Sequence, residues 1–185
     1  MGMMKLYKFI KKKNYYENKP NKNRKIQLLC CGWSSYININ FKNCVMKVKD
    51  LAFEIAKKAF DGKFDKGGKP YINHLVRVSE PFEEDDFLYP IAILHDLLED
   101  CPEWNTKSLS CLFHENVVKT IDLLTRKENQ DYFDYINKIS ESSWATKIKL
   151  ADLKDNMDIT SLSDLGNKDF ERLQKYLKAY NILTN

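Results

Sequence analysis

Residues 92–100, AILHDLLED, combine apolar residues with a group of ionisable side chains. His95 stands directly before Asp96, and Glu99 and Asp100 follow one turn later. On one helix these four side chains would fall within about 140° of arc, with leucines on the remaining surface. Three carboxylates on one face repel each other, and a divalent cation would remove that cost. A solvated acidic face is the alternative, but it does not explain an adjacent His-Asp pair in an apolar segment.

Two further stretches supply residues of the same kind. In GGKPYINH (67–74), His74 lies one turn into an expected helix that follows a glycine loop. In IKLADLKDNM (148–157), Asp152 has apolar neighbours, where an unpaired carboxylate would be expensive. His74, His95, Asp96 and Asp152 together offer two imidazoles and two carboxylates. This mixed set suits Mn²⁺, Fe²⁺, Co²⁺ or Zn²⁺ and leaves positions open for water and a substrate oxygen.

The chain after residue 45 repeats its apolar residues at spacings of three and four, which is typical of amphipathic helices. Pro70 is well placed as the first residue of a helix, and a break is expected near His114. We therefore expect an all-α bundle of six or seven helices. The expected helices cover 47–60, 70–80, 85–100, 106–125 with its break, 131–140, 143–158 and 167–183.

The first 45 residues differ from the rest in charge. They hold ten Lys and Arg residues and one acidic residue, Glu17, so their charge is +9. Because the whole chain is +4, residues 46–185 carry −5. We expect a short basic, Asn/Lys-rich, partly irregular extension over 1–45 and one helical domain over 46–185. The extension is either a solvated tail or a segment that binds nucleic acid through its positive charge.

Composition excludes several classes of protein. No apolar run approaches the roughly 20 residues that span a bilayer, so no membrane span is expected. The N-terminus lacks the apolar core of a secretory signal. The cysteines form no CxxC pair, and their odd count of five without a secretory signal predicts reduced thiols and a cytoplasmic protein. The cysteines are Cys30, Cys31, Cys44, Cys101 and Cys111.

The strings GGKPYINH, AILHDLLED and IKLADLKDNM, in this order, resemble the motifs of the HD superfamily of metal-dependent phosphohydrolases. Within it they resemble the hydrolase domain of RelA/SpoT-type alarmone enzymes. The short length is similar to that of the stand-alone small alarmone hydrolases, including the metazoan SpoT homologue. The resemblance covers about residues 46–160 and implies an HD-domain helical bundle.

The resemblance implies removal of the 3′-pyrophosphate of (p)ppGpp by metal-activated water, with Mn²⁺ as the metal. It also gives a task to eight residues. They are the metal ligands His74, His95, Asp96 and Asp152, the catalytic residues Glu99 and Asp100, and the substrate-binding residues Lys66 and Asn156.

Several positions depart from the family pattern, and we expect none of them to touch the metal ligands. They are Phe60, Asp65, Asp155, Asp158 and Ile159. Most fall where the base and phosphates would bind, so a nucleoside monophosphate or NADPH remains an alternative substrate. A nucleic-acid-associated module, with the basic extension for binding and a structural metal site, is the alternative from another class. The oligomeric state stays open.

Overall fold

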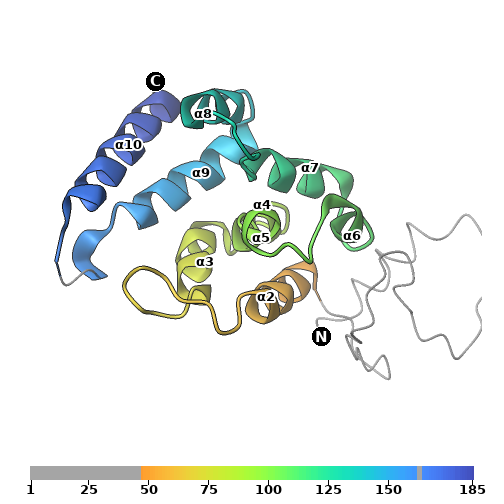
Figure 1. Cartoon of the computed structure of the whole chain (residues 1–185). Helices are drawn as coiled ribbons and strands as arrows, with labels where there is room; N and C mark the ends of the chain where they lie inside the picture. Colours follow the sequence, from red (N-terminus) through yellow and green to blue (C-terminus); the bar gives the residue numbers. More distant parts are fainter. Residues whose placement is uncertain (1–46, 162–163) are drawn as a thin grey trace, which may run out of the picture.

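The computed structural model describes residues 47–161 and 164–185, and within these ranges the chain is all-α, as predicted (Figure 1). The expected extension over 1–45 lies outside the described residues, so the boundary near residue 45 stays a prediction. None of the described helices is long and apolar enough to cross a membrane. In chain order the elements are α2 (Val48–Ala59), α3 (Ile72–Ser79), η1 (Glu80–Phe82), α4 (Leu88–Ile93), α5 (Leu97–Asp100), α6 (Thr106–Ser110), α7 (Glu115–Leu124), α8 (Tyr132–Ser140), α9 (Ser143–Asn156), η2 (Ile159–Ser161) and α10 (Asn167–Thr184).

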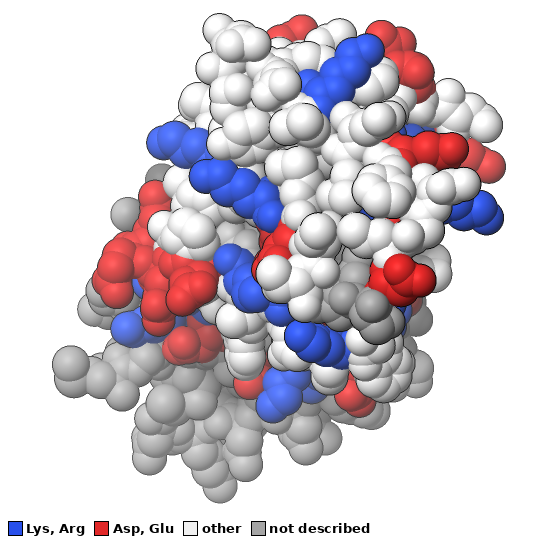
Figure 2. Space-filling view, turned by 90° about the vertical axis from the view of Figure 1, so that its left-hand side faces the viewer, with Lys and Arg blue, Asp and Glu red and all other residues white. Residues whose placement is uncertain are grey.

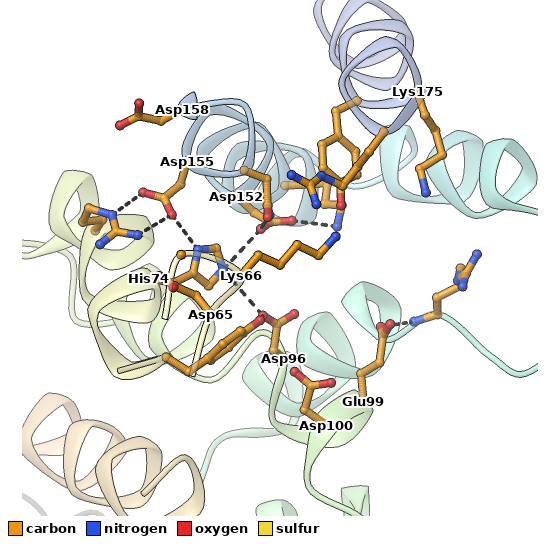
Figure 3. Close-up of a pocket in the computed structure, with 18 of the residues that line it drawn as sticks. Asp65, Lys66, His74, Asp96, Glu99, Asp100, Asp152, Asp155, Asp158 and Lys175 are labelled. Carbon is orange, nitrogen blue, oxygen red and sulfur yellow. Dashed lines mark hydrogen bonds and ion pairs between the residues drawn. The ribbon is translucent and has the colours of Figure 1, made fainter. Parts of the chain in front are cut away.

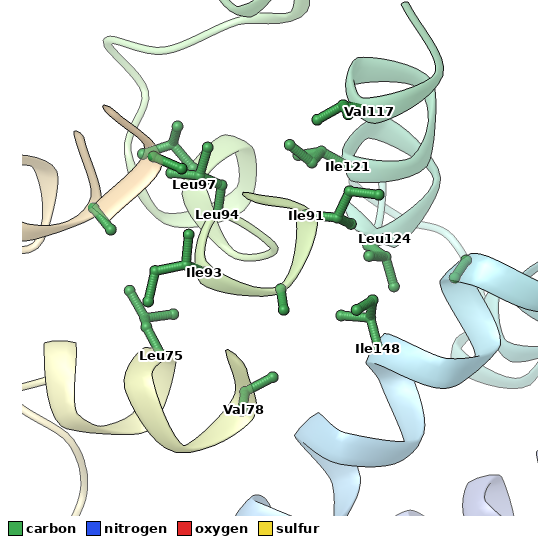
Figure 4. Packing of buried hydrophobic residues seen from close by; sticks show 14 of the residues in the cluster. Leu75, Val78, Ile91, Ile93, Leu94, Leu97, Val117, Ile121, Leu124 and Ile148 are labelled. Carbon is green, nitrogen blue, oxygen red and sulfur yellow. The ribbon is translucent and has the colours of Figure 1, made fainter. Parts of the chain in front are cut away.

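Helix α4 forms the centre of the apolar core. It packs against α2, α3, α7 and α9, and its residues from Pro90 to Ile93 are buried. Figure 4 shows side chains of the surrounding helices around it, among them Leu75, Ile121 and Ile148. Because α4 is enclosed on these sides, the segment that follows it is held in a fixed place.

The predicted continuous helix over 85–100 is wrong. Helix α4 ends at Ile93 and α5 begins at Leu97, so His95 and Asp96 lie in a turn between two short helices. Leu94 and Leu97 are both fully buried on either side of the break. The apolar period therefore continues across a turn, which is why the sequence pattern did not reveal it.

The predicted start of a helix at Pro70 is also displaced. Pro70 instead forms an isolated antiparallel bridge with Phe64, and α3 begins at Ile72. The loop is closed by two backbone hydrogen bonds, from Asp65 N to Lys69 O at 2.8 Å and from Tyr71 N to Lys63 O at 2.9 Å. Gly68 turns the loop with a φ of 74°, a conformation that costs glycine little.

The remaining predicted helices lie close to their expected bounds. The expected break near His114 is present, since α6 ends at Ser110 and α7 begins at Glu115. The Nδ1 of His114 accepts a hydrogen bond from Asn116 N and so caps α7. Asp131 caps α8 and Ser142 caps α9 through their side-chain oxygens. Helix α10 packs against both α8 and α9 (Figure 1), which brings a C-terminal helix beside the candidate site.

Candidate metal centre

Two imidazoles and two carboxylates converge between α3, α9 and the turn after α4. His74, His95 and Asp96 each present one ligand atom, and these atoms lie within 4.8 Å of one another. Asp152 joins them through Oδ1, which is 3.5 Å from His74 Nε2 and 3.6 Å from His95 Nε2. Asp96 Oδ2 is 3.6 Å from His74 Nε2 and 3.1 Å from His95 Nε2. We call these four residues the His/Asp cluster.

Hydrogen bonds on the far side of each ring turn both Nε2 atoms inward. His95 Nδ1 lies 2.8 Å from the backbone oxygen of Ala92, and His74 Nδ1 lies 2.6 Å from Asp155 Oδ2. Both partners are acceptors, so each Nδ1 carries the hydrogen and each Nε2 is left for the cluster. His95 Nε2 is buried with no hydrogen-bond partner among the described residues. A buried imidazole nitrogen of this kind fits a metal ligand.

The two carboxylates are also held by neighbouring donors. Tyr71 Oη donates to Asp96 Oδ2 at 2.6 Å. Asp152 accepts at Oδ2 from the buried ammonium of Lys149 at 2.7 Å and at Oδ1 from Asn156 Nδ2 at 2.5 Å. Such supporting hydrogen bonds fix the orientation of metal ligands in proteins.

The electrostatics of the cluster favour positive charge at its centre. Burial opposes protonation of His74, but the hydrogen bonds that its ring donates to Asp155 and Asp96 outweigh burial and raise its pKa to about 9. Burial likewise opposes protonation of His95, yet the charge of Asp96 holds its pKa well above the usual range. Burial would raise the pKa of Asp152, but the neighbouring Lys149 charge lowers it. The cluster thus binds protons where a divalent cation would fit, and the donor set suits such an ion.

The cluster lies in a pocket of about 480 Å³ whose lining is strongly charged (Figure 3). Besides the acidic residues, six cations line it: Arg77 and Lys149, which are bonded to Asp155 and Asp152, and four others, Lys66, Arg126, Arg172 and Lys175. We call these four the cationic wall. Burial and the charge of Arg172 lower the pKa of Lys66, and burial and the charge of Arg126 lower that of Lys175. These cations therefore repel one another, and an anion between them would relieve that repulsion.

The outer surface has the same division of charge. Figure 2 shows the side of the molecule that lies at the left of Figure 1. Lysine and arginine side chains cross its middle, the largest group of acidic side chains lies at the left of this view, and others lie at its top and right edge.

The four other predicted site residues all line this pocket. Glu99 is exposed and accepts a hydrogen bond at Oε2 from Arg126 N at 3.1 Å. Asp100 is exposed as a residue, but its carboxyl group is partly removed from water inside the pocket. This desolvation and the charge of Asp96 raise its pKa. Lys66 reaches into the pocket from the closed loop (Figure 3), whereas Asn156 is hydrogen-bonded to Asp152. In the structure, Asn156 therefore supports Asp152, a predicted metal ligand.

The expectation that no departing position touches a metal ligand is wrong for Asp155. Its carboxylate contacts the imidazole of His74 directly. Phe60 is linked to the cluster only through Tyr71, which donates a hydrogen bond to Asp96. The buried ring of Phe60 stacks on that of Tyr71 at 5.1 Å between centroids. Asp65 and Asp158 line the pocket, as expected for positions near a substrate.

Sequence reasoning missed three members of the cationic wall. Arg126 follows α7, and Arg172 and Lys175 lie on α10, one turn apart. Lys175 Nζ also lies 4.6 Å from the ring centre of Tyr132, another residue of the pocket. The i, i+3 spacing of Arg172 and Lys175 on an amphipathic helix was a signal, but nothing in the sequence showed which way that face points.

Comparison with solved structures finds a similar fold. No family model matches the chain. A structure described as that of a metazoan orthologue of SpoT that hydrolyses ppGpp matches with a TM-score of 0.62 and 20% sequence identity. The match covers 74% of this chain and 84% of that chain. The chain has the HD-domain fold. In this HD domain the adjacent His95 and Asp96 belong to the cluster that could hold a metal ion.

Proposed function

We propose that the chain is a metal-dependent phosphohydrolase that removes the 3′-pyrophosphate of (p)ppGpp. The observation that carries the proposal is a pocket with the His/Asp cluster and the cationic wall in its lining, on the fold of a ppGpp hydrolase. This arrangement suits a substrate with two phosphorylated ends, one bound at the His/Asp cluster and the other at the cationic wall. We further propose the cytoplasm as its compartment, where the buried thiol of Cys101 stays reduced.

The His/Asp cluster would hold one divalent ion. Mn²⁺ suits its two nitrogen and two oxygen donors, and Fe²⁺, Co²⁺ or Zn²⁺ would suit them as well. When bound, such an ion would stabilise negative oxygen and lower the pKa of a bound water to about 7. Tyr71 and Lys149 keep the carboxylates of Asp96 and Asp152 in place for this role.

Glu99 and Asp100 would manage the protons of the reaction. Hydrolysis consumes one water, forms a bond from its oxygen to phosphorus and breaks the bond from phosphorus to the 3′ oxygen. The attacking water loses a proton, and the leaving 3′ oxygen gains one. Asp100 holds a proton more readily than an ordinary aspartate, because partial burial and the charge of Asp96 raise its pKa. We therefore assign the base to Glu99 and the proton donor to Asp100.

The cationic wall would bind phosphate oxygens of the nucleotide. Lys66 reaches into the pocket from the loop before α3, and Arg172 and Lys175 line it from α10. Charge-assisted hydrogen bonds from such groups are the usual means of phosphate recognition. Tyr132 and Tyr176 also line the pocket and offer aromatic surface beside the cations.

The proposal is tested by incubating the purified chain with ppGpp and Mn²⁺ and measuring released pyrophosphate. We expect release that stops with a chelator and is lost in Asp96→Ala. Equal release from Asp96→Ala would mean that the activity comes from another protein. No release by the wild-type chain, with one Mn²⁺ bound per chain, would reject the substrate and keep the metal site.

A second nucleotide substrate is favoured by one feature of the pocket. Asp65 and Asp158 line it at positions where related alarmone enzymes carry basic residues. Carboxylates there disfavour an additional phosphate and accept hydrogen bonds from a base or a ribose. A nucleoside monophosphate and NADPH should therefore be assayed beside ppGpp under the same conditions. A higher kcat/KM for either of them would move the assignment to that substrate.

A further inference from the structure

A chain of three polar side chains lies behind His74, on the side away from the cluster. Asp155 Oδ2 is 2.6 Å from His74 Nδ1. Arg77 donates to the same carboxylate twice, from Nε to Oδ1 at 2.6 Å and from Nη2 to Oδ2 at 3.0 Å. Figure 3 shows the carboxylate of Asp155 directed at the imidazole of His74. None of these contacts has a part in the mechanism proposed above.

The carboxylate of Asp155 determines how the ring of His74 is presented. An ionised carboxylate only accepts hydrogen bonds, so His74 Nδ1 must carry a hydrogen. The other nitrogen, Nε2, then points to Asp96 and Asp152. His95 is oriented by a backbone carbonyl instead. The presentation of His74 thus depends on one side chain that can be substituted, and that of His95 does not.

Arg77 keeps Asp155 in this position. Arg77 and His74 lie one turn apart on α3, so Asp155 of α9 is held by two side chains of the same helix. The side chain of Asp155 is only 12% exposed, and a carboxylate removed from water to this degree needs paired donors. The two parallel bonds from the guanidinium fix the carboxylate plane as well as its place. Without them the carboxylate could turn away from His74.

We propose that Asp155, held by Arg77, is a positioning residue that fixes the imidazole of His74 for divalent-metal binding. The inference rests on the proposed function, because the metal site is the one assigned there. It also explains a departure in the sequence, since Asp155 replaces a residue that is usually histidine in the resembling alarmone enzymes. In this chain the replacement supports a ligand rather than contacting substrate.

Calorimetric titration of the full chain with Mn²⁺ alone tests the proposal. We expect Asp155→Ala to weaken Mn²⁺ binding by about 10- to 100-fold, the usual effect of removing a partner of a metal ligand. Asp155→Asn keeps an oxygen that can accept from Nδ1, so its loss should be smaller. Arg77→Ala should also weaken binding, and adding it to Asp155→Ala should cost little more. Asp158→Ala is the matched control, because it removes an exposed pocket carboxylate that is not in contact with His74.

Equal losses in Asp155→Ala and Asp158→Ala would overturn the proposal, since charge alone would then explain them. Unchanged binding in Asp155→Ala would overturn it too. If Asp155→Ala fails to fold, Asp155→Asn and Arg77→Ala decide in its place. No Mn²⁺ binding by the wild-type chain would reject the metal site and this inference together. Mn²⁺ binding without ppGpp hydrolysis would reject only the substrate, and the variants would still decide the role of Asp155.

A spectroscopic readout separates positioning from a general loss of structure. With Zn²⁺ as a diamagnetic probe, the Nδ1 proton of His74 should give a downfield resonance in the wild-type chain. That resonance should be lost in Asp155→Ala, whereas the Nδ1 proton of His95, bonded to Ala92 O, should remain. Retention of both resonances, or loss of both, would contradict the proposal.

Discussion

The His/Asp cluster and the cationic wall line one pocket, yet their side chains are held in different ways. In the cluster, His74, His95 and Asp152 are buried, and each has a hydrogen-bond partner that fixes its orientation. In the wall, the side chains of Lys66 and Lys175 do not stabilise each other, because burial and neighbouring positive charge both lower their pKa values. The side chains of the cluster are thus held by their neighbours without a ligand, whereas those of the wall would be stabilised by a bound anion.

This difference predicts how the two regions respond to substitution. A buried charged group that loses its partner pays the full desolvation cost, so changes in the cluster should be severe. The side chains of the wall are partly solvated, and water screens the charge that a substitution removes. Changes there should alter substrate affinity and leave the chemistry nearly intact. The experiments below test this contrast in order of expected effect.

The largest effect is expected from Asp96→Ala and His74→Ala. Each substitution removes one predicted metal ligand, and the charged groups of the cluster that it faced lose a partner. Mn²⁺ binding should fall below detection, and turnover should drop by roughly 10³-fold or more, because in the proposed mechanism these residues hold the ion that would activate the attacking water. Calorimetry and pyrophosphate release measure the two effects, and circular dichroism checks the fold. Wild-type Mn²⁺ affinity in either variant would mean that the cluster is not the metal site.

Glu99→Gln should separate metal binding from catalysis. The amide oxygen can still accept the hydrogen bond from Arg126 N, so the local structure should persist. Loss of the base should lower kcat by about 10²- to 10⁴-fold, and the Kd for Mn²⁺ should stay within about threefold. Glu103→Gln is the control, because Glu103 is an exposed residue four positions later. Full activity in Glu99→Gln would remove Glu99 from the mechanism.

The cluster was predictable from the sequence because its residues stand in short strings with unusual composition. An Asp within the apolar run around Asp152, and a His-Asp pair before two leucines, have few structural explanations. The helical class was predictable for a related reason, since apolar spacing of three and four persists through α7 and α8. The exact turn at His95 was not, because the buried residues Leu94 and Leu97 keep the helical period across the break.

Three members of the cationic wall, Arg126, Arg172 and Lys175, and the support behind His74 could not be predicted, because both depend on tertiary packing. Arg172 and Lys175 look like ordinary surface residues until α10 is packed against α8 and α9. From the sequence, Asp155 was expected near the base and phosphates of the substrate. Only the packing of α9 against α3 shows that it contacts His74. Local sequence motifs can therefore predict the ligands of a site, but they do not reveal the groups that orient those ligands.

The pH dependence of stability should distinguish the cluster from the wall. The pKa of His74 is about 9 in the folded chain and about 6.5 when unfolded, so folding favours its protonated form. The resulting stabilisation is fully present below pH 6.5 and is lost as the pH rises to about 9. The loss in metal-free protein should amount to about 3 kcal/mol, measured by urea unfolding at each pH.

Added Mn²⁺ should reverse this trend, because the ion competes with the protons of the cluster. Between pH 6.5 and 9 the affinity for Mn²⁺ should rise by up to about tenfold per pH unit for each proton released. Saturating Mn²⁺ should therefore abolish the fall in stability. If the metal-free and Mn²⁺-loaded proteins lose stability in parallel, the titrating groups lie outside the cluster.

The smallest effect is expected from Lys175→Ala. A lost charge-assisted hydrogen bond to phosphate is worth about 1.5 kcal/mol, which corresponds to roughly a tenfold rise in KM. The kcat should change by less than about twofold, because Lys175 is absent from the proton transfers. Lys178→Ala is the matched control, since Lys178 is one turn later on α10 and lies over the ring of Phe133 instead of in the pocket. Added salt should raise the KM of the wild-type chain and of Lys178→Ala more than that of Lys175→Ala, which has one phosphate contact fewer to screen. A fall in kcat at unchanged KM would instead place Lys175 in the chemical step and erase the contrast between the two regions.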